Sequence, residues 1–561
     1  TGVSTGIFLG SVSSGLSLTN GDQVTVTYVD PTDDFGNEVT LTDNAYYNVT
    51  LISGEFTESQ TWTAASSPYL ITGDVDLLGE ADLTIEPGVE VRFIPLYDDR
   101  SSGLDPNRSE IRINSGNFVA VGTETDSIIF TTTTLDPNGS EWHGIYFASS
   151  TRDITNIKYC RFEGYNEAVK LQQTYGSSST ATYINIEHCL FRKGGTALRA
   201  QDNGNLFYVF SNNTVLNSKA LNLTWVSAYS VTVENNQIIH TASNDRVIYI
   251  EGALAYSKSS SLSETDTTAV TIKNNTITGA YITSGYPPQQ WAIELYGRNQ
   301  QSNESERAQR IYLIEDNVFN KAGGVYVSSY SDDNTQLSFK NNDIYGTRYQ
   351  ALEVQNTNGV VSNNSFRKSY VKTNSYYLDY EGSGSAKLAH CSIDFTKNVV
   401  DSSDGCGVFV QNFLGRIDSN TITNSGRGIE LLGSFEQSSS PMIRHNNLTN
   451  NHFDAIYLRD YSNPTINYND LFSNSTYSDY HDIDSRVQSS NFDELNARLN
   501  YWGETTTAVM DEGGNPKNLS NIYDQYDDAS LGFVNYGNYL EADVSLPPPV
   551  PSNAFALVNG S

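Results

Sequence analysis

The sequence predicts an all-β solenoid, in which short strands coil around a common axis. The 561 residues include 36 Tyr but only 2 Met, a balance that favours strands because Tyr is common in strands and Met in helices. A short phrase containing Asn recurs every 22 to 26 residues, and a second phrase of alternating apolar residues lies between its copies. Repeats of this length are typical of solenoids.

The first phrase is Asn-Asn, or a close variant, followed one residue later by an apolar residue. Its copies are Asn212-Asn213-Thr214-Val215, Asn235-Asn236-Gln237-Ile238, Asn274-Asn275-Thr276-Ile277, Asn341-Asn342-Asp343-Ile344 and Asn363-Asn364-Ser365-Phe366, with looser ones at Asp316-Asn317, Ser419-Asn420, Asn446-Asn447 and Asn469-Asp470. Asn tolerates the left-handed backbone of tight turns, and its amide can bond to the amide of the neighbouring coil. We therefore expect a ladder of Asn turns.

The second phrase is a small residue followed by apolar, any and apolar residues. Examples are Gly144-Ile145-Tyr146-Phe147, Ala220-Leu221-Asn222-Leu223, Ala292-Ile293-Glu294-Leu295, Gly324-Val325-Tyr326-Val327, Ala351-Leu352-Glu353-Val354, Gly407-Val408-Phe409-Val410, Gly428-Ile429-Glu430-Leu431 and Ala455-Ile456-Tyr457-Leu458. This alternation predicts a strand with one buried face, and the middle residue of each triplet then points outward.

Residues 70–540 resemble a right-handed parallel β-helix of the broad pectate-lyase-like class. The stretch from Gly73 to Val89 and the run Gly122-Thr123-Glu124-Thr125-Asp126 are similar to the first coils of its secreted bacterial members, and Asn500-Tyr501-Trp502-Gly503 is similar to their closing coil. This fold hosts lyases, hydrolases, epimerases, adhesins and structural shafts, so its function depends on the site residues.

The N-terminal 52 residues do not follow the repeat. Gly6–Gly10, Leu16–Leu18 and Asp22–Asp30 are predicted strands that resemble an Ig-like module of bacterial surface proteins. Only about four strands fit in this length, where such a sandwich has about seven. We therefore expect a partial Ig-like β-sandwich at residues 1–52, followed by a linker at residues 53–69.

Residues 541–561 combine a stiff linker, Leu546–Pro551, with one alternating strand that contains Phe555 and Leu557. In one interpretation this strand completes the sandwich of the next copy, and head-to-tail contacts then form a filament. In another, the chain is cut from a tandem array and each end belongs to a neighbouring module. An unpaired tail is the third interpretation.

Stacking the second phrase coil on coil predicts two outward columns. The first column is Tyr146, Lys170, Arg199, Asn222, Tyr249, Glu294, Tyr326, Glu353, Asp379, Phe409, Glu430 and Tyr457, and the second includes Gln172, Gln201, Glu251, Tyr296, Gln355, Glu381 and Gln411. Because adjacent coils are about 4.8 Å apart, two groups of side chains should lie close together. They are Glu353 with Asp379 and Glu381, and Tyr249 and Tyr296 with Glu251 and Glu294.

These columns suggest a glycan-binding groove, because aromatic faces stack on sugars and paired carboxylates bind Ca²⁺ or perform acid–base catalysis. The candidate glycan-binding residues are Tyr146, Tyr249, Tyr296, Tyr326 and Tyr457, and the candidate catalytic residues are Glu353, Asp379, Glu381, Glu251 and Glu294. The alternative is that the columns form no binding site, because an acidic, Tyr-rich protein carries such residues on every face by chance. No Arg or Lys is expected beside Glu353, since Lys170 and Arg199 lie several coils away.

Ca²⁺ is the one cofactor that the sequence suggests. Acidic runs that could bind it are Asp30, Asp33 and Asp34, then Asp479, Asp482 and Asp484, and finally Asp524, Asp527 and Asp528. None matches an EF-hand loop, so solvated loops are the alternative. Cys160 and Cys189 occupy equivalent places in successive coils and are expected to be core thiols rather than a disulfide.

The net charge of the chain disfavours some classes of function. The formal net charge is −32, which disfavours binding to nucleic acid and acidic membranes, and no apolar stretch reaches the roughly 18 residues of a membrane span. We expect an extracellular structural or adhesive surface protein. Its expected partners are its own copies or the neighbouring modules of a longer chain and, in addition, a polysaccharide. The alternative is a secreted polysaccharide lyase or glycoside hydrolase acting on an acidic glycan.

Overall fold

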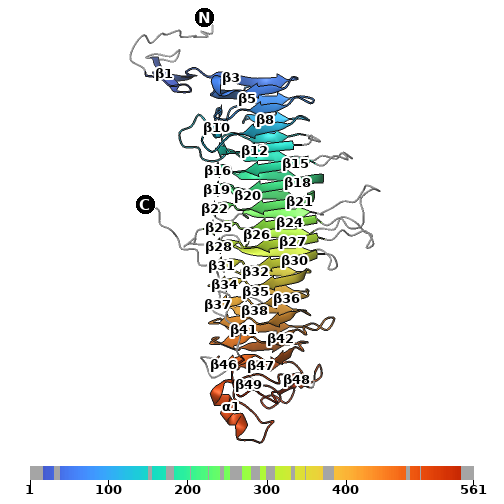
Figure 1. Ribbon diagram of the computed structural model, residues 1–561. Coiled ribbons are helices and arrows are strands. Elements are labelled where there is room, and N and C mark those ends of the chain that lie inside the picture. Colours follow the sequence, from blue (N-terminus) through green and yellow to red (C-terminus); the bar gives the residue numbers. More distant parts are fainter. Residues whose placement is uncertain are drawn as a thin grey trace, which may run out of the picture.

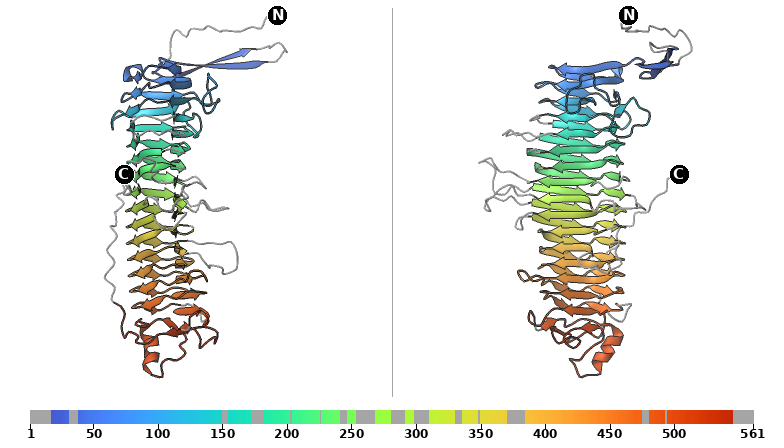
Figure 2. Two further views of the ribbon diagram at one scale, coloured as in Figure 1. Left: turned by 90° about the vertical axis from the view of Figure 1, so that its right-hand side faces the viewer. Right: turned by 180° about the vertical axis from the view of Figure 1, so that it is seen from behind.

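The computed structural model describes most of the chain as one long shaft of stacked coils (Figures 1 and 2). The described residues are 17–30, 38–148, 154–171, 182–201, 204–224, 226–240, 246–252, 268–279, 291–297, 310–329, 335–347, 349–369, 384–474, 480–492 and 494–544. The predicted all-β parallel solenoid is confirmed, because strands pair in parallel from one coil to the next along the shaft.

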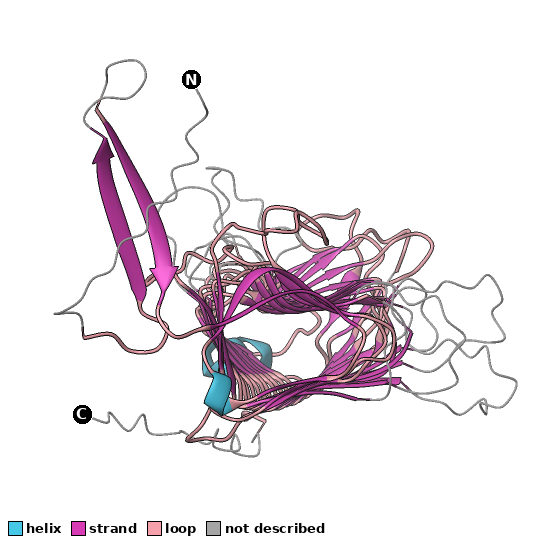
Figure 3. Cartoon of the chain, turned by 90° about the horizontal axis from the view of Figure 1, so that it is seen from above, coloured by secondary structure: helices cyan, strands magenta, loops and turns pink. Residues whose placement is uncertain are grey.

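Each typical coil contributes one strand to each of three ladders, which Figure 3 shows end-on. Ladder A consists of β3 (Thr50–Phe56), β5 (Tyr69–Leu77), β8 (Glu110–Ile113), β11 (Gly144–Phe147), β14 (Glu167–Leu171), β17 (Thr196–Gln201), β20 (Lys219–Thr224), β23 (Ile248–Gly252), β26 (Trp291–Gly297), β29 (Gly324–Ser329), β32 (Leu352–Gln355), β35 (Gly384–Ala389), β38 (Cys406–Gln411), β41 (Arg427–Leu432), β44 (Ile456–Arg459), β47 (Ile483–Arg486) and β49 (Ile522–Tyr523).

Ladder B consists of β4 (Gln60–Trp62), β6 (Leu83–Ile85), β9 (Phe118–Val121), β12 (Ile154–Lys158), β15 (Thr182–Glu187), β18 (Gly204–Ser211), β21 (Ser227–Glu234), β24 (Thr268–Lys273), β27 (Arg310–Glu315), β30 (Thr335–Lys340), β33 (Asn358–Ser362), β36 (Ile393–Thr396), β39 (Arg416–Asp418), β42 (Met442–Arg444), β45 (Thr465–Asn467), β48 (Glu494–Asn496) and β50 (Phe533–Asn535).

Ladder C consists of β7 (Glu90–Phe93), β10 (Ile128–Thr132), β13 (Cys160–Glu163), β16 (Leu190–Arg192), β19 (Thr214–Leu216), β22 (Gln237–His240), β25 (Thr276–Gly279), β28 (Val318–Asn320), β31 (Asp343–Tyr345), β34 (Ser365–Arg367), β37 (Val399–Asp401), β40 (Thr421–Thr423), β43 (Asn447–Thr449) and β46 (Asp470–Phe472).

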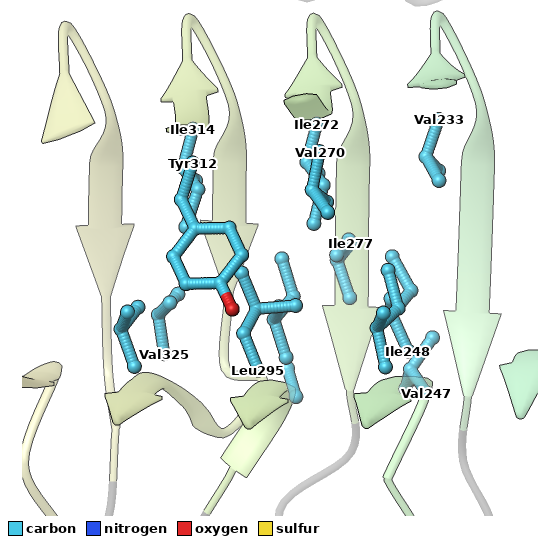
Figure 4. Close-up of a cluster of buried hydrophobic side chains, with 14 of the residues drawn as sticks. Val233, Val247, Ile248, Val270, Ile272, Ile277, Leu295, Tyr312, Ile314 and Val325 are labelled. Atoms are coloured by element: carbon cyan, nitrogen blue, oxygen red, sulfur yellow. The ribbon is translucent and has the colours of Figure 1, made fainter. Parts of the chain in front are cut away.

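The core fills the interior of the coils. In β26, Ile293 and Leu295 point inward and are fully buried, whereas Glu294 between them points to the opposite side of the strand. Aliphatic side chains of ladders A, B and C meet in this interior, as Figure 4 shows for Leu295, Val270 and their neighbours. The alternation in the second phrase is therefore the signature of this packing.

A buried asparagine ladder runs through the turns between ladders B and C, as the first phrase predicts. It consists of Asn213, Asn236, Asn275, Asn317, Asn342, Asn364, Asn398, Asn420, Asn446, Asn469 and Asn500, each at most 2% exposed. The backbone N–H of each Asn donates to the side-chain Oδ1 of the next, as in Asn317 to Asn342 at 3.1 Å. The preceding residue adopts the left-handed conformation, for example Asn341 with φ 56°.

The shaft begins earlier than the sequence suggested. The predicted linker at residues 53–69 contains most of β3, all of β4 and the short 3₁₀-helix η1 (Ala64–Ser66), and β3 pairs with β5. The linker prediction is wrong because Phe56 and Trp62 pack in the core. Their burial makes this segment the first coil.

The described N-terminal residues before the shaft form one antiparallel pair, β1 (Gln23–Asp30) with β2 (Val39–Tyr46). Figures 2 and 3 show this hairpin projecting from the shaft. The predicted strand at Asp22–Asp30 corresponds to β1, whereas Gly6–Gly10 lies outside the described residues. These residues therefore show a hairpin, not a sandwich.

The opposite end is closed by α1 (Gly503–Asp511), which buries Met510. After β50 the chain follows the last coils, where Leu540 donates its backbone N–H to Asn500. No helix in the described part of the chain is long and apolar enough to cross a membrane.

Candidate functional site

An outer column of side chains runs along ladder A, one from each coil. In register it is Glu55, Asp76, Arg112, Tyr146, Lys170, Arg199, Asn222, Tyr249, Glu294, Tyr326, Glu353, Lys387, Phe409, Glu430, Tyr457, Asp484 and Tyr523. The predicted first column agrees with this register at every position except Asp379.

Lys387 occupies the place that the sequence assigned to Asp379. Glu353 is aligned with Lys387 of β35, and the Lys387 Nζ lies 2.9 Å from Glu353 Oε1. The expectation that no cation lies beside Glu353 is therefore wrong. Asp379 and Glu381 lie outside the described residues, so their grouping with Glu353 stays a prediction.

Four aromatic side chains gather near the middle of ladder A, and we call Tyr249, Trp291, Tyr296 and Tyr326 the aromatic patch. The ring centroids of Tyr296 and Tyr326 are 5.2 Å apart, those of Trp291 and Tyr326 are 5.3 Å apart, and those of Tyr249 and Tyr296 are 6.2 Å apart. All four side chains are half-buried. Partly open aromatic faces of this kind suit stacking against an apolar ring face.

Carboxylates border the aromatic patch. The Tyr249 hydroxyl donates to Glu251 Oε2 at 2.8 Å, and the Arg246 guanidinium pairs with Glu294 while lying 4.4 Å from the centre of the Tyr249 ring. Burial raises the pKa of Glu294, and Arg246 opposes that shift. Burial and the neighbouring Glu251 raise the pKa of Tyr249 to about 12. The predicted grouping of these residues is therefore confirmed.

Tyr146 and Tyr457 lie far from the aromatic patch. They are four coils before and seven coils after Tyr249 in the outer column, which places them about 20 and 35 Å away at about 4.8 Å per coil. Tyr146 is buried, and the Tyr457 ring lies under the Arg427 guanidinium at 3.9 Å. Only Tyr249, Tyr296 and Tyr326 of the predicted glycan-binding residues form one surface.

A second cluster, which the sequence analysis missed, centres on His143 near the N-terminal end of ladder A. The His143 Nε2 lies 4.0 Å from Glu110 Oε2 and 4.0 Å from Glu167 Oε2, and neither ring nitrogen has a hydrogen-bond partner. Lys170 Nζ lies 2.8 Å from Glu167 Oε2. We call Glu110, His143, Glu167 and Lys170 the His143 cluster.

Burial dominates the electrostatics of the His143 cluster. It raises the pKa of Glu110 to about 7, with the Asp74 carboxylate adding to the rise. It lowers the pKa of His143 to about 4, assisted by Lys170. The pKa of Glu167 is lowered because hydrogen bonds from Lys170 and Arg199 outweigh burial. Near neutral pH the cluster therefore holds an uncharged imidazole beside a partly protonated carboxyl group.

A third cluster lies near the C-terminal end and contains Asp454, His481 and Asp484, which we call the His481 cluster. One ligand atom from each residue lies within 4.8 Å of the others, and this is the one such group of three or more His, Cys, Asp or Glu in the described residues. Asp484 belongs to the predicted Ca²⁺ run with Asp482 and Asp479, and Asp479 lies outside the described residues. Asp482 itself accepts hydrogen bonds from Asn521 and Asn474, and burial raises its pKa to about 7.

The other predicted Ca²⁺ residues are arranged differently. Asp524 accepts backbone hydrogen bonds from Tyr526 and Val534, both at 2.9 Å. Asp528 accepts from Ser530, and Asp527 accepts from the Asp524 backbone. These carboxylates therefore hold the loop before β50. Asp33 and Asp34 lie outside the described residues, as does the Asp30 side chain.

The four cysteines are buried and free, in agreement with the prediction for Cys160 and Cys189. The Cys189 backbone N–H donates to Asn213 Oδ1 at 2.9 Å. Cys189 therefore occupies the ladder position one coil before Asn213. Phe555 and Leu557, the predicted assembly residues, lie outside the described part of the chain.

The fold is that of a parallel β-helix, a class of coiled repeat protein that presents long columns of side chains. A family model described as a right-handed beta helix region matches residues 380–541. That range covers the coils from β35 to the closing end, and ladders A, B and C continue the same architecture toward the N-terminus. No curated protein matches the chain.

Proposed function

We propose that the protein is an extracellular structural or adhesive shaft whose ladder A face binds a polysaccharide at the aromatic patch. The observation that carries the proposal is the convergence of Tyr249, Trp291, Tyr296 and Tyr326 on successive coils of β23, β26 and β29. A polysaccharide that runs along the shaft would stack its sugars on these rings, and Glu251 and Glu294 would accept hydrogen bonds from hydroxyl groups.

The charge balance favours a neutral polysaccharide over an acidic one. Glu294 is paired with Arg246 and Glu353 with Lys387, so these carboxylates are neutralised locally. The net charge of −32 repels a polyanion at long range. The preferred partner is therefore an uncharged glycan with accessible apolar ring faces.

The test is binding of the full chain to a panel of neutral and acidic polysaccharides, measured by affinity electrophoresis and calorimetry. Tyr296→Ala and Tyr326→Ala are each expected to weaken binding about five- to tenfold, because each removes one stacking surface. Tyr183→Ala is the matched control, since Tyr183 stacks on Phe207 in ladder B at 4.7 Å. Failure of every polysaccharide to bind, or equal loss in all three variants, would contradict the proposal.

Head-to-tail assembly is the second part of the proposal. A two-stranded hairpin is marginal by itself, and β1 exposes Val26 and Val29 at 57% and 47%. An added strand from another copy, carrying Phe555 and Leu557, would cover such residues. Deletion of residues 555–561 is expected to abolish filaments seen by electron microscopy. Filaments that persist after the deletion, or an intact chain that forms none, would reject this part.

One observation favours a catalytic alternative, a secreted polysaccharide lyase or hydrolase. In the His143 cluster, Glu110 has a pKa of about 7 and His143 of about 4. A carboxyl group whose pKa lies near the working pH suits general acid catalysis, and the neutral imidazole beside it offers a proton acceptor. The alternative predicts release of reducing or unsaturated sugar ends, which Glu110→Gln and His143→Gln abolish. Absence of release across the same panel would reject it.

A further inference from the structure

The His481 cluster forms where two consecutive coils enter ladder A. Asp454 and His481 occupy equivalent places just before β44 and β47, and the His481 backbone N–H donates to Asp454 Oδ1 at 2.9 Å. Asp484 belongs to the outer column and is aligned with Tyr457. The fold therefore brings an imidazole and two carboxylates together from segments 27 residues apart.

The spacing of these groups suits a shared cation better than direct hydrogen bonds. His481 Nδ1 lies 4.0 Å from Asp484 Oδ2, which is too long for a hydrogen bond, and this buried nitrogen has no hydrogen-bond partner. Two ligands that each lie about 2.0 to 2.2 Å from one metal ion can be up to about 4.4 Å apart when they lie on opposite sides of it. The side chains of Asp454 and Asp484 are 0% and 4% exposed, and that of His481 is 13% exposed.

Two arginines hold the carboxylates in place. Arg427 Nε lies 3.1 Å from Asp454 Oδ2, and Arg486 contacts both oxygens of Asp484 at 2.7 and 3.0 Å. Each carboxylate oxygen has two lone pairs, so these contacts leave acceptor positions on both residues. Hydrogen-bonded carboxylates of this kind are common around metal sites because the outer partners orient the ligands.

The two carboxylates also act on each other. The ligand atoms of Asp454 and Asp484 lie within 4.8 Å of each other, so their negative charges repel. A divalent cation between them would offset this repulsion. The His481 nitrogen, which has no hydrogen-bond partner, would be a ligand of this ion.

We propose that Asp454, His481 and Asp484 bind one divalent transition-metal ion. The nitrogen ligand favours Zn²⁺ or Mn²⁺ over Ca²⁺, which prefers a set of six to eight oxygen ligands. The ion would join the coils of β44 and β47 near the closing end of the shaft. This site is separate from the aromatic patch and does not rest on polysaccharide binding.

The test uses the full chain after removal of metals with a chelator. Calorimetric titration with ZnCl₂, MnCl₂ and CaCl₂ is expected to show one saturable site for Zn²⁺ or Mn²⁺ and at least tenfold weaker binding of Ca²⁺. The bound ion should also raise the melting temperature, because a ligand that binds the folded state stabilises it. His481→Ala and His481→Gln are expected to remove both effects, and the second variant keeps most of the side-chain volume.

His445→Asn is the matched control. His445 Nδ1 also faces a carboxylate, Asp418 Oδ1 at 3.3 Å, but no third His, Cys, Asp or Glu of the described residues joins this pair to form a ligand group. Asn suits position 445 because its φ is 53°. This variant should bind the metal like the wild type. The proposal is overturned if the wild type shows no saturable site, if Ca²⁺ binds more tightly than Zn²⁺ and Mn²⁺, or if both folded His481 variants bind like the wild type.

Discussion

Two columns run along most of the shaft, and they differ in how their side chains vary. The asparagine ladder keeps one residue type from Asn213 to Asn500 because each side chain must satisfy backbone groups of neighbouring coils. The outer column of ladder A carries acids, bases, aromatic rings and an amide at equivalent places. Its side chains point away from the core, so their identity is not fixed by the fold. The asparagine ladder therefore follows from the architecture of the shaft, whereas the outer column contains the candidate sites.

The largest loss of stability is expected when one side-chain amide is removed from the middle of the asparagine ladder. Asn342→Ala would leave the buried backbone N–H of Asn317 without its acceptor, and it would remove the hydrogen bonds that the Asn342 amide donates to Ile314 and Asn364. The unsatisfied N–H costs about 1–3 kcal/mol and each of the two lost hydrogen bonds about 0.5–1.5 kcal/mol, so we expect a loss of about 2–6 kcal/mol. Thermal and urea unfolding measure the loss.

Asn341→Gly is the control for this substitution. Asn341 has φ 56° and its amide makes an exposed contact with Asp316, so glycine fits the same backbone. We expect a change below about 1 kcal/mol. Equal effects of the two substitutions would show that the ladder contributes little.

The next largest effect concerns the His143 cluster and depends on pH. Glu110 has a folded pKa of about 7 and an ordinary value of 4.5. Its contribution to stability is therefore fully present below pH 4.5 and is lost as the pH rises through about 7. Glu110→Gln should remove this loss, which amounts to about 3 kcal/mol at most.

The measurement compares melting temperatures of wild type and Glu110→Gln at pH 5 and pH 8. The melting temperature of the variant, relative to that of the wild type, should be higher at pH 8 than at pH 5. His143 titrates in the opposite sense, since its stabilising contribution is lost as the pH falls through about 4, and it is present in both proteins. A difference that does not change with pH would contradict the assignment.

A smaller effect is expected at the ion pair of Glu353 and Lys387. Lys387→Met would leave the Glu353 carboxylate, 6% exposed, with the Gln355 amide but no cation. Because the Lys387 side chain is 22% exposed, we expect a loss of about 1–2 kcal/mol, below the range for fully buried pairs. The double variant Glu353→Gln with Lys387→Met should recover most of the loss. A double variant that is less stable than Lys387→Met would contradict the pairing.

The smallest effect is expected when the asparagine ladder is extended by one Asn at its N-terminal end. Cys189 Sγ lies 3.6 Å from the Ile157 carbonyl, and Asn213 Nδ2 donates to the equivalent Ile186 carbonyl at 2.9 Å. Cys189→Asn should reproduce that contact and change the free energy of unfolding by less than about 1 kcal/mol. Severe destabilisation would mean that the ladder position at Cys189 excludes an amide.

The parts of the molecule that repeat locally were predictable. The Asn phrase and the apolar alternation each follow from one coil packing on the next. The asparagine ladder and the outer column from Tyr146 to Tyr457, apart from Lys387, could therefore be derived from spacing. The register failed after Glu353, where Leu378-Asp379-Tyr380 and Ala386-Lys387-Leu388 both match the apolar-any-apolar pattern. The second match is the strand, and the small residue Ser385 before Ala386 is the signal that favours it.

The His143 and His481 clusters were harder to derive. Glu110, His143 and Asp454 lie at or before the first residues of ladder A strands, outside the apolar-any-apolar triplets from which the columns were read. Their proximity depends on coil lengths, such as the 27 residues between Asp454 and His481. The linker assignment at residues 53–69 failed for a related reason, because Phe56 and Trp62 show no repeat until their contacts with the core are known.

The direction of the asparagine ladder bears on how the chain folds during synthesis. Each ladder Asn donates its backbone N–H to a side chain of the following coil, which leaves the ribosome later. A growing shaft therefore always ends in a coil whose buried amide still lacks its acceptor. Each new coil satisfies the coil before it, so folding is expected to proceed from the N-terminal end toward α1 in step with translation.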